Sequence, residues 1–183
     1  MDRNKSKMNY PSFENCTIAI VGLGYVGLPL AIEFSRTNYC LKSKIKLSRK
    51  VIGFDINKKR IEELRQNFDK TLEVTEEELK NLENINFTND IKSLVKADVF
   101  IITVPTPIDE SKIPYLGHLK SASKMVGEVL RIRKGKSKLS PIPFVIYEST
   151  VYPGATEEIC IPEIEDASSL TASLDFNYGY SPE

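Results

Sequence analysis

The chain has 183 residues, of which 41% are apolar and 27% charged, so its composition is that of a globular domain with a hydrophobic core. Disordered tails, collagens and small disulfide-rich proteins have different compositions. Because 25 Lys and Arg balance 25 Asp and Glu, the net charge does not point to nucleic acid or an anionic membrane. A small-molecule ligand is therefore favoured.

The first 15 residues are polar, and we expect them to form an extension (1–15) that contains neither a signal peptide nor a membrane span. The chain has three widely spaced cysteines, Cys16, Cys40 and Cys160, and one histidine, His118. This pattern argues against a structural zinc site and a disulfide framework, and favours a reducing cytoplasm. We expect His118 to be an ordinary helix-surface residue.

Short apolar runs alternate with segments of helical periodicity along the rest of the chain. The runs are typical of strands and lie at 17–21, 51–54, 85–88, 99–104, 144–147 and 177–180. Helical patterns occupy 29–36, 58–68, 75–82, 90–96, 116–131 and 155–165. Strands that are apolar on both faces and separated by helices indicate an α/β fold. We predict one domain over 16–183, a doubly wound (Rossmann), mainly parallel six-stranded sheet with helices on both faces.

Two segments, 36–50 and 131–138, are rich in Lys and Arg, and the first has no acidic residue. Each follows a predicted helix and leads into the next strand, at the edge of the sheet opposite the expected ligand edge. We interpret both as solvated loops near helix C-termini. A docking face for an acidic partner is the alternative.

A GxGxxG motif lies directly after the first predicted strand and directly before the first helix. In a dinucleotide-binding domain, its first glycine allows the tight turn and its second lets the backbone approach a pyrophosphate. Its third lets the helix and strand pack closely, and the N–H groups at the helix start bind the phosphates. The motif predicts cofactor binding by Gly22, Leu23, Gly24, Tyr25, Val26 and Gly27.

The dinucleotide-binding fingerprint has a second part, an acidic residue at the end of the second strand. The stretch VIGFD supplies this residue as Asp55. Its carboxylate can accept hydrogen bonds from both ribose hydroxyls of the adenosine, and it repels a 2′-phosphate, so NAD is favoured over NADP. Asp55 comes later than the usual spacing of about 20 residues. A loop insertion at 36–50 accounts for the excess.

Several longer stretches resemble the UDP-glucose/GDP-mannose dehydrogenase family. GLGYVGLPLAIEF, VIGFDINKKRIEEL, ADVFIITVPTPIDE, VIYESTVYPGATEEICIPEIE and DFNYGYSPE occur in the family's order, from about residue 17 to 183. The motifs VPTPID and YESTVYPGATEE are most similar to those of bacterial UDP-N-acetylhexosamine 6-dehydrogenases. These enzymes make uronic acid sugars for surface polysaccharides such as capsule.

The resemblance implies roles for residues outside the glycine motif. Arg60 would lie by the adenosine, and Val104, Pro105 and Thr106 would line the cofactor after the fourth strand. Ser149 and Thr150 would lie near the nicotinamide. The family's catalytic residues match Thr150 and Glu183.

The resemblance also implies an NAD-dependent oxidation of the C6 hydroxyl of a UDP-sugar to a carboxylate. In the family, the nucleophilic cysteine lies beyond the SPE motif, as do the substrate lysine and asparagine. We therefore expect the chain to bind NAD without turnover of its own, with a separate or missing C-terminal substrate domain. The oligomeric state and the sugar stay open.

Two other interpretations stay open on the sequence alone. The chain could be a non-catalytic NAD-binding or partner-docking module that uses its basic loops. Another Rossmann dehydrogenase would share the glycine motif, although it would not explain YESTVYPGATEE.

Overall fold

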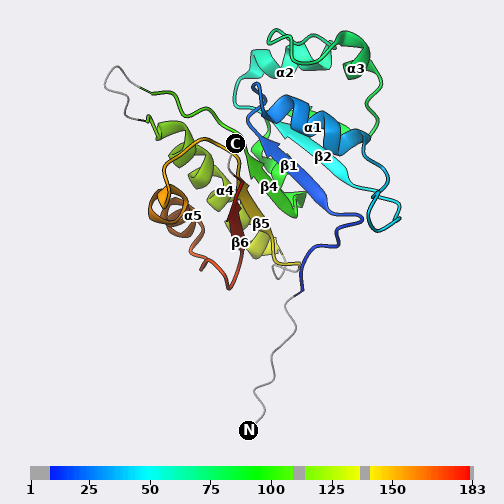
Figure 1. The fold of residues 1–183 in the computed structure, drawn as a ribbon. Helices are drawn as coiled ribbons and strands as arrows, with labels where there is room; N and C mark the ends of the chain where they lie inside the picture. Colours follow the sequence, from blue (N-terminus) through cyan, green and yellow to red (C-terminus); the bar gives the residue numbers. More distant parts are fainter. Residues whose placement is uncertain (1–8, 109–113, 137–140, 182–183) are drawn as a thin grey trace.

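The computed structural model describes residues 9–108, 114–136 and 141–181. Its centre is a sheet in which every neighbouring pair of strands is parallel, with the order β3-β2-β1-β4-β5-β6 (Figure 1). The strands are β1 (Thr17–Val21), β2 (Lys50–Phe54), β3 (Ile85–Thr88), β4 (Val99–Ile102), β5 (Phe144–Tyr147) and β6 (Asn177–Tyr180). The predicted doubly wound α/β fold is confirmed.

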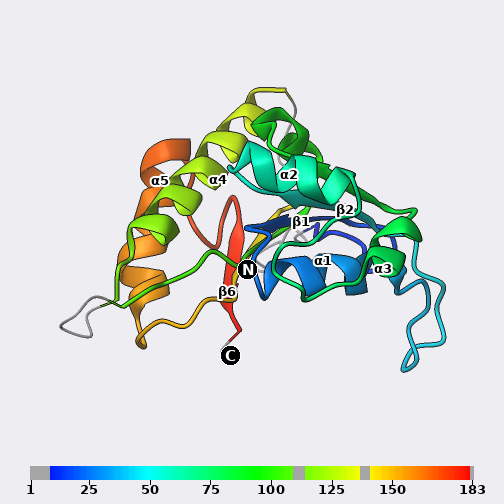
Figure 2. The ribbon, with the colours of Figure 1, turned by 90° about the horizontal axis from the view of Figure 1, so that it is seen from above.

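Helical segments cover both faces of this sheet, as the view from above shows (Figure 2). Beside one face lie α1 (Gly27–Arg36), α2 (Lys58–Arg65) and α3 (Glu76–Lys80). The other face carries η1 (Ile91–Lys96), α4 (Gly117–Lys136), η2 (Thr156–Cys160) and α5 (Ile161–Ser168). The strand order reverses between β1 and β4, where a doubly wound sheet opens a crevice at the carboxyl ends of its strands.

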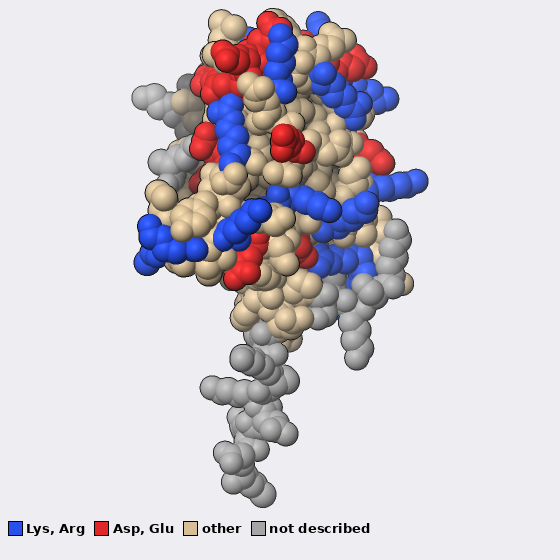
Figure 3. Space-filling model, turned by 90° about the vertical axis from the view of Figure 1, so that its right-hand side faces the viewer, with Lys and Arg blue, Asp and Glu red and all other residues tan. Residues whose placement is uncertain are grey.

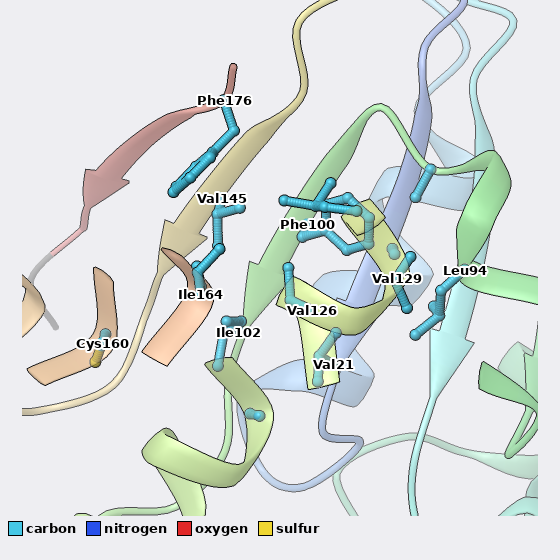
Figure 4. Packing of buried hydrophobic residues seen from close by; sticks show 14 of the residues in the cluster. Val21, Leu94, Phe100, Ile102, Val126, Val129, Val145, Cys160, Ile164 and Phe176 are labelled. Carbon is cyan, nitrogen blue, oxygen red and sulfur yellow. The ribbon is translucent and has the colours of Figure 1, made fainter. Parts of the chain in front are cut away.

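Successive residues of the central strands pack into the two cores in alternation. Ala19 and Val21 of β1 belong to the core under α4 and α5, whereas Ile18 and Ile20 belong to the core under α1 and α2. The first core also contains Phe100 and is shown in Figure 4, which labels Val21, Leu94, Phe100, Ile102, Val126, Val129, Val145, Cys160, Ile164 and Phe176. Strands buried on both faces explain the continuous apolar runs of the sequence.

Several predicted elements differ from the structure in type or bounds. The helix predicted over 155–165, for example, is a π-helix over 156–160 followed by α5. Residues 91–96 form a 3₁₀ helix, capped by the side chain of Asp90, which accepts from the N–H of Lys92 at 3.0 Å. A 3₁₀ helix rises about 2.0 Å per residue against 1.5 Å in an α-helix, which suits the short connection 89–98. The helix predicted over 116–131 continues to Lys136. Basic residues 131–136 therefore belong to α4 and are not a loop; residues 137 and 138 lie outside the described residues.

Most of the basic segment 36–50, residues 37–49 between α1 and β2, forms a hairpin that projects from the amino edge of the sheet. Tyr39 and Lys46 form an antiparallel bridge, and the N–H of Cys40 donates to the carbonyl of Ile45 at 2.9 Å. Arg49 anchors its base, buried with its guanidinium 5.4 Å from the ring of Phe13 and 5.3 Å from that of Phe34. Figure 3 shows this side of the molecule, with Lys and Arg gathering on its lower half. No helix in the described ranges is long and apolar enough to cross a membrane.

Candidate functional site: a dinucleotide crevice at the carboxyl edge

The glycine loop makes a turn that requires glycine at two positions. Gly22 has a φ of +100°, in the region that L side chains rarely adopt. A Cβ on Gly27 would lie 1.8 Å from the carbonyl oxygen of Gly22 and 2.4 Å from Oγ1 of Thr103. That hydroxyl donates to the same Gly22 oxygen at 2.7 Å. Helix α1 therefore starts as close to β1 and β4 as backbone atoms allow.

The start of α1 presents a row of free hydrogen-bond donors. Within the described ranges, the backbone N–H groups of Gly24, Tyr25, Val26 and Gly27 donate to no protein acceptor. A Cβ built on Gly24 would meet no atom within 4 Å, so there is open space beside the loop. Four unpaired donors and the positive end of a helix dipole form a site for an anion such as a pyrophosphate.

Asp55 follows β2 and is held beside the glycine loop. Its Oδ2 accepts from the N–H of Leu23 at 2.9 Å, and its Oδ1 accepts from the N–H of Asn57 at 2.8 Å. Each carboxylate oxygen has a further lone pair with which to accept a ribose hydroxyl. The carboxylate is therefore fixed in the crevice, with lone pairs left to accept further hydrogen bonds.

Arg60 lies in the wall of the same crevice, but its guanidinium already has protein partners. The side chain is 3% exposed, and its Nη1 lies 2.7 Å from Oδ1 of Asp69. Its Nε donates to the carbonyl of Leu23 at 2.9 Å. The structure thus brings Arg60 to the crevice, with its donors pointing to protein atoms.

The crevice has a volume of about 400 Å³. Its lining contains residues of the glycine loop and of the loops after β2 and β4. It also contains two groups of residues that local sequence patterns did not identify. The missed residues are Lys70 and Thr71 after α2, and His118, Ser121, Ala122 and Met125 of α4. His118 is exposed, as expected, yet it lines the crevice. Because α4 comes long after the glycines in sequence, only the position of the helix over the sheet reveals this wall.

The loops after β4 and β5 are tied together where the nicotinamide end is expected. Oγ1 of Thr106 donates to the carbonyl of Thr150 at 2.8 Å, and Oγ of Ser149 donates to the carbonyl of Val104 at 2.7 Å. Val104 and Pro105 line the crevice. Thr106, Ser149 and Thr150 lie beyond its lining, on the same edge of the sheet. The expected catalytic residue Glu183 lies outside the described residues.

None of the three cysteines lines the crevice. Cys16 is buried just before β1, and Cys40 lies in the hairpin at the opposite edge. Cys160 is buried at the end of η2, and burial raises the pKa of its thiol. No cluster of His, Cys, Asp and Glu in the described ranges could hold a metal ion. The described crevice can thus bind a dinucleotide but presents no thiol to a substrate.

Comparison with known proteins places this crevice in a family. Residues 16–183 match the UDP-glucose/GDP-mannose dehydrogenase family, NAD binding domain. The chain is 52% identical over 166 residues to the UDP-N-acetyl-D-glucosamine 6-dehydrogenase of Pseudomonas aeruginosa, covering 91% of this chain and 35% of that protein. It is 50% identical over 169 residues to Protein CapL of Staphylococcus aureus, again covering 35% of the relative. The chain therefore spans about a third of the length of these relatives.

Solved structures agree with the sequence matches. The ternary complex of the GDP-mannose dehydrogenase of Pseudomonas aeruginosa is similar with a TM-score of 0.77 and 30% identity, covering 91% of this chain and 36% of the other. The NDP-N-acetyl-D-galactosaminuronic acid dehydrogenase of Methanosarcina mazei is similar with a TM-score of 0.75 and 26% identity, covering 92% and 34%. The chain belongs to the UDP-glucose/GDP-mannose dehydrogenase family, matches its NAD binding domain, and uses NAD as its cofactor.

Proposed function

We propose that the chain is the NAD-binding portion of an enzyme that oxidises the C6 hydroxyl of a UDP-N-acetylhexosamine to a carboxylate for surface polysaccharide synthesis. The observation that carries the proposal is the row of four unpaired N–H groups at the start of α1, with open space beside Gly24 and with Asp55 bound to the N–H of Leu23. The identities of 52% and 49% to the UDP-N-acetyl-D-glucosamine 6-dehydrogenases of Pseudomonas aeruginosa and Salmonella typhi support the substrate class.

The residues present fit NAD in three places. The N–H groups of residues 24–27 would hold its pyrophosphate, and Asp55 would accept its adenosine ribose hydroxyls while repelling a 2′-phosphate. Val104 and Pro105 would contact its adenosine half, and Thr106, Ser149 and Thr150 would lie toward the nicotinamide end. When bound, NAD accepts the hydride that leaves the sugar carbon.

The proposal assigns the nucleophile and the sugar site to a further domain. Oxidation of an aldehyde to a carboxylate through a thioester requires a thiolate that attacks and later leaves. Cys16 and Cys160 are buried and Cys40 lies at the opposite edge of the sheet, so none can reach a substrate in the crevice. Because the proposal places both the thiolate and the sugar site in that further domain, we expect the 183-residue chain to bind NAD without reducing it. We place this activity in the cytoplasm, which agrees with three unpaired cysteines.

A chimera tests this role directly. Residues 16–183 replace the matching segment of the Pseudomonas aeruginosa UDP-N-acetyl-D-glucosamine 6-dehydrogenase, and NADH formation is followed with its UDP-sugar. The chimera should reduce NAD, and the same chimera with Asp55→Ala should lose at least about tenfold in kcat/KM for NAD. A chimera that folds but never forms NADH would contradict the proposal, and so would NADH formation by the 183-residue chain alone.

A further inference from the structure

A buried ion pair lies directly behind the glycine loop. Nη1 of Arg60, in the first turn of α2, is 2.7 Å from Oδ1 of Asp69, in the loop after α2, and the two side chains are 3% and 0% exposed. Removing two charges from water is unfavourable, and such a pair contributes little to stability compared with apolar packing. The hydrogen bonds that the two side chains make to the surrounding backbone offset this cost, and one of them reaches the glycine loop.

Asp69 holds Arg60 from a rigid base. Its Oδ1 accepts from the N–H and the hydroxyl of Thr71 at 3.0 and 2.7 Å. Its Oδ2 accepts from the N–H groups of Glu73 and Val74 at 2.9 and 3.0 Å. These four hydrogen bonds fix the carboxylate that faces the Arg60 guanidinium.

From that position Arg60 fixes one peptide group of the glycine loop. Its Nε donates to the carbonyl of Leu23 at 2.9 Å, while the N–H of Leu23 donates to Oδ2 of Asp55 at 2.9 Å. Leu23 is thus held at both its polar groups. In a planar trans peptide the carbonyl of one residue and the N–H of the next point in opposite directions. The bond from Arg60 therefore sets the direction of the Gly24 N–H, the first of the four unpaired donors.

We propose that Arg60 and Asp69 are positioning residues that orient the Leu23–Gly24 peptide for the cofactor's diphosphate. In this arrangement Arg60 acts through the loop, by the hydrogen bond from its Nε to the carbonyl of Leu23. The proposal rests on the proposed function, because it takes NAD as the ligand of the crevice.

The chain offers a matched control at the opposite edge of the sheet. Nη2 of Arg133 on α4 lies 3.0 Å from Oδ1 of Asp98, and the two side chains are 11% and 19% exposed. Arg133 also donates to the carbonyl of Ala97, as Arg60 donates to that of Leu23. This pair has a similar composition and backbone contact but lies at the amino ends of the strands, away from the crevice.

The test compares Arg60→Lys with Arg133→Lys by calorimetric titration with NAD, ADP and AMP, well below the unfolding temperature of each variant. A lysine keeps the charge but cannot contact both Asp69 and Leu23. Arg60→Lys should weaken NAD and ADP binding at least about tenfold and weaken AMP binding much less, because the diphosphate contact is lost. Arg133→Lys should bind all three ligands as the wild type does.

A measurement on the wild-type protein covers the case in which Arg60→Lys fails to fold. On addition of ADP, the NMR resonance of the Gly24 N–H should shift strongly and that of the Arg60 Nε–H should shift little. Equal losses for ADP and AMP in Arg60→Lys, or a large shift of the Arg60 Nε–H, would show direct contact and overturn the inference. Normal ADP binding by Arg60→Lys would overturn this inference but leave the proposed function intact. A wild type that binds neither NAD nor ADP would overturn both.

Discussion

At the scale of single residues, Gly24 and Gly27 serve the same loop for different reasons. A Cβ on Gly27 would overlap backbone atoms of the protein, whereas a Cβ on Gly24 would enter only the open space beside the loop. Gly27 is therefore required for the fold, and Gly24 for the ligand. Sequence spacing alone predicts both glycines without separating these roles.

Alanine substitutions should separate the two roles. Gly24→Ala should keep the unfolding temperature of the wild type but lose NAD affinity at least about tenfold, because its methyl group occupies the space for the pyrophosphate. Gly27→Ala should lose about 3 kcal/mol of stability, the upper end of the cost of overpacking. Thermal unfolding and NAD titration of both variants provide the check, and unchanged NAD binding by Gly24→Ala would contradict the account.

The positions of site residues can be predicted from the sequence where the site is built from neighbours along the chain. The glycine loop is continuous in sequence, and Asp55 ends an apolar run, so local pattern places both at the ligand edge. His118 and Met125 could not be placed in this way, because they line the crevice only through the packing of α4 on the sheet. The pair of Arg60 with Asp69 also has no pattern of its own, since a loop of irregular backbone joins them.

At the level of whole elements, the hairpin between α1 and β2 (residues 37–49) carries a basic surface that lies far from the crevice. Its lysines, Lys42, Lys44 and Lys46, are exposed, and it lies at the amino edge of the sheet, whereas the cofactor residues lie at the carboxyl edge. The late position of Asp55 in the fingerprint follows from this hairpin, which lengthens the connection without moving β2.

Replacing Lys42, Lys44 and Lys46 together by alanine should leave NAD affinity within about twofold of the wild type, since surface charges this far from the site are screened. Arg49→Ala in the same hairpin is the comparison variant, because it removes the guanidinium that lies between Phe13 and Phe34. It should lower the free energy of unfolding by about 1–3 kcal/mol. Titration with NAD and urea unfolding measure both effects. A tenfold loss of NAD affinity in the triple variant would favour a role for the basic loop in the site.

Helix α3 contains a pH-sensitive cap. Oε2 of Glu78 accepts from the N–H of Thr75 at 2.9 Å, and its Oε1 lies 3.0 Å from Nη1 of Arg36. These contacts lower the pKa of Glu78 from 4.5 to about 2. A lowered carboxyl pKa stabilises the folded state above the ordinary value of 4.5, and this contribution is lost as the pH falls from 4.5 toward 2.

Glu78→Gln should therefore be less stable than the wild type at neutral pH and should lose less stability between pH 4.5 and 2. Urea unfolding at a series of pH values measures this difference. Glu77→Gln is the control on the same helix, because the Glu77 side chain forms no ion pair in the described part of the chain. Parallel pH profiles for the wild type and Glu78→Gln would contradict the assignment.

At the scale of the whole molecule, the sheet brings all these features to one edge. The order β3-β2-β1-β4-β5-β6 places the loops after β1, β2 and β4 side by side, so residues from distant parts of the sequence form one crevice. This architecture could be predicted, because continuous apolar runs separated by helices leave a parallel sheet as the favoured fold. The exact position of α4 and the 3₁₀ form of η1 depend on packing and loop length.

Calorimetric titration of the 183-residue chain with NAD and NADP shows whether the crevice is an NAD site. We expect saturable binding of NAD at one site and binding of NADP at least about tenfold weaker, because the Asp55 carboxylate repels the 2′-phosphate. No NAD binding by the folded chain, or equal affinity for the two cofactors, would contradict this expectation.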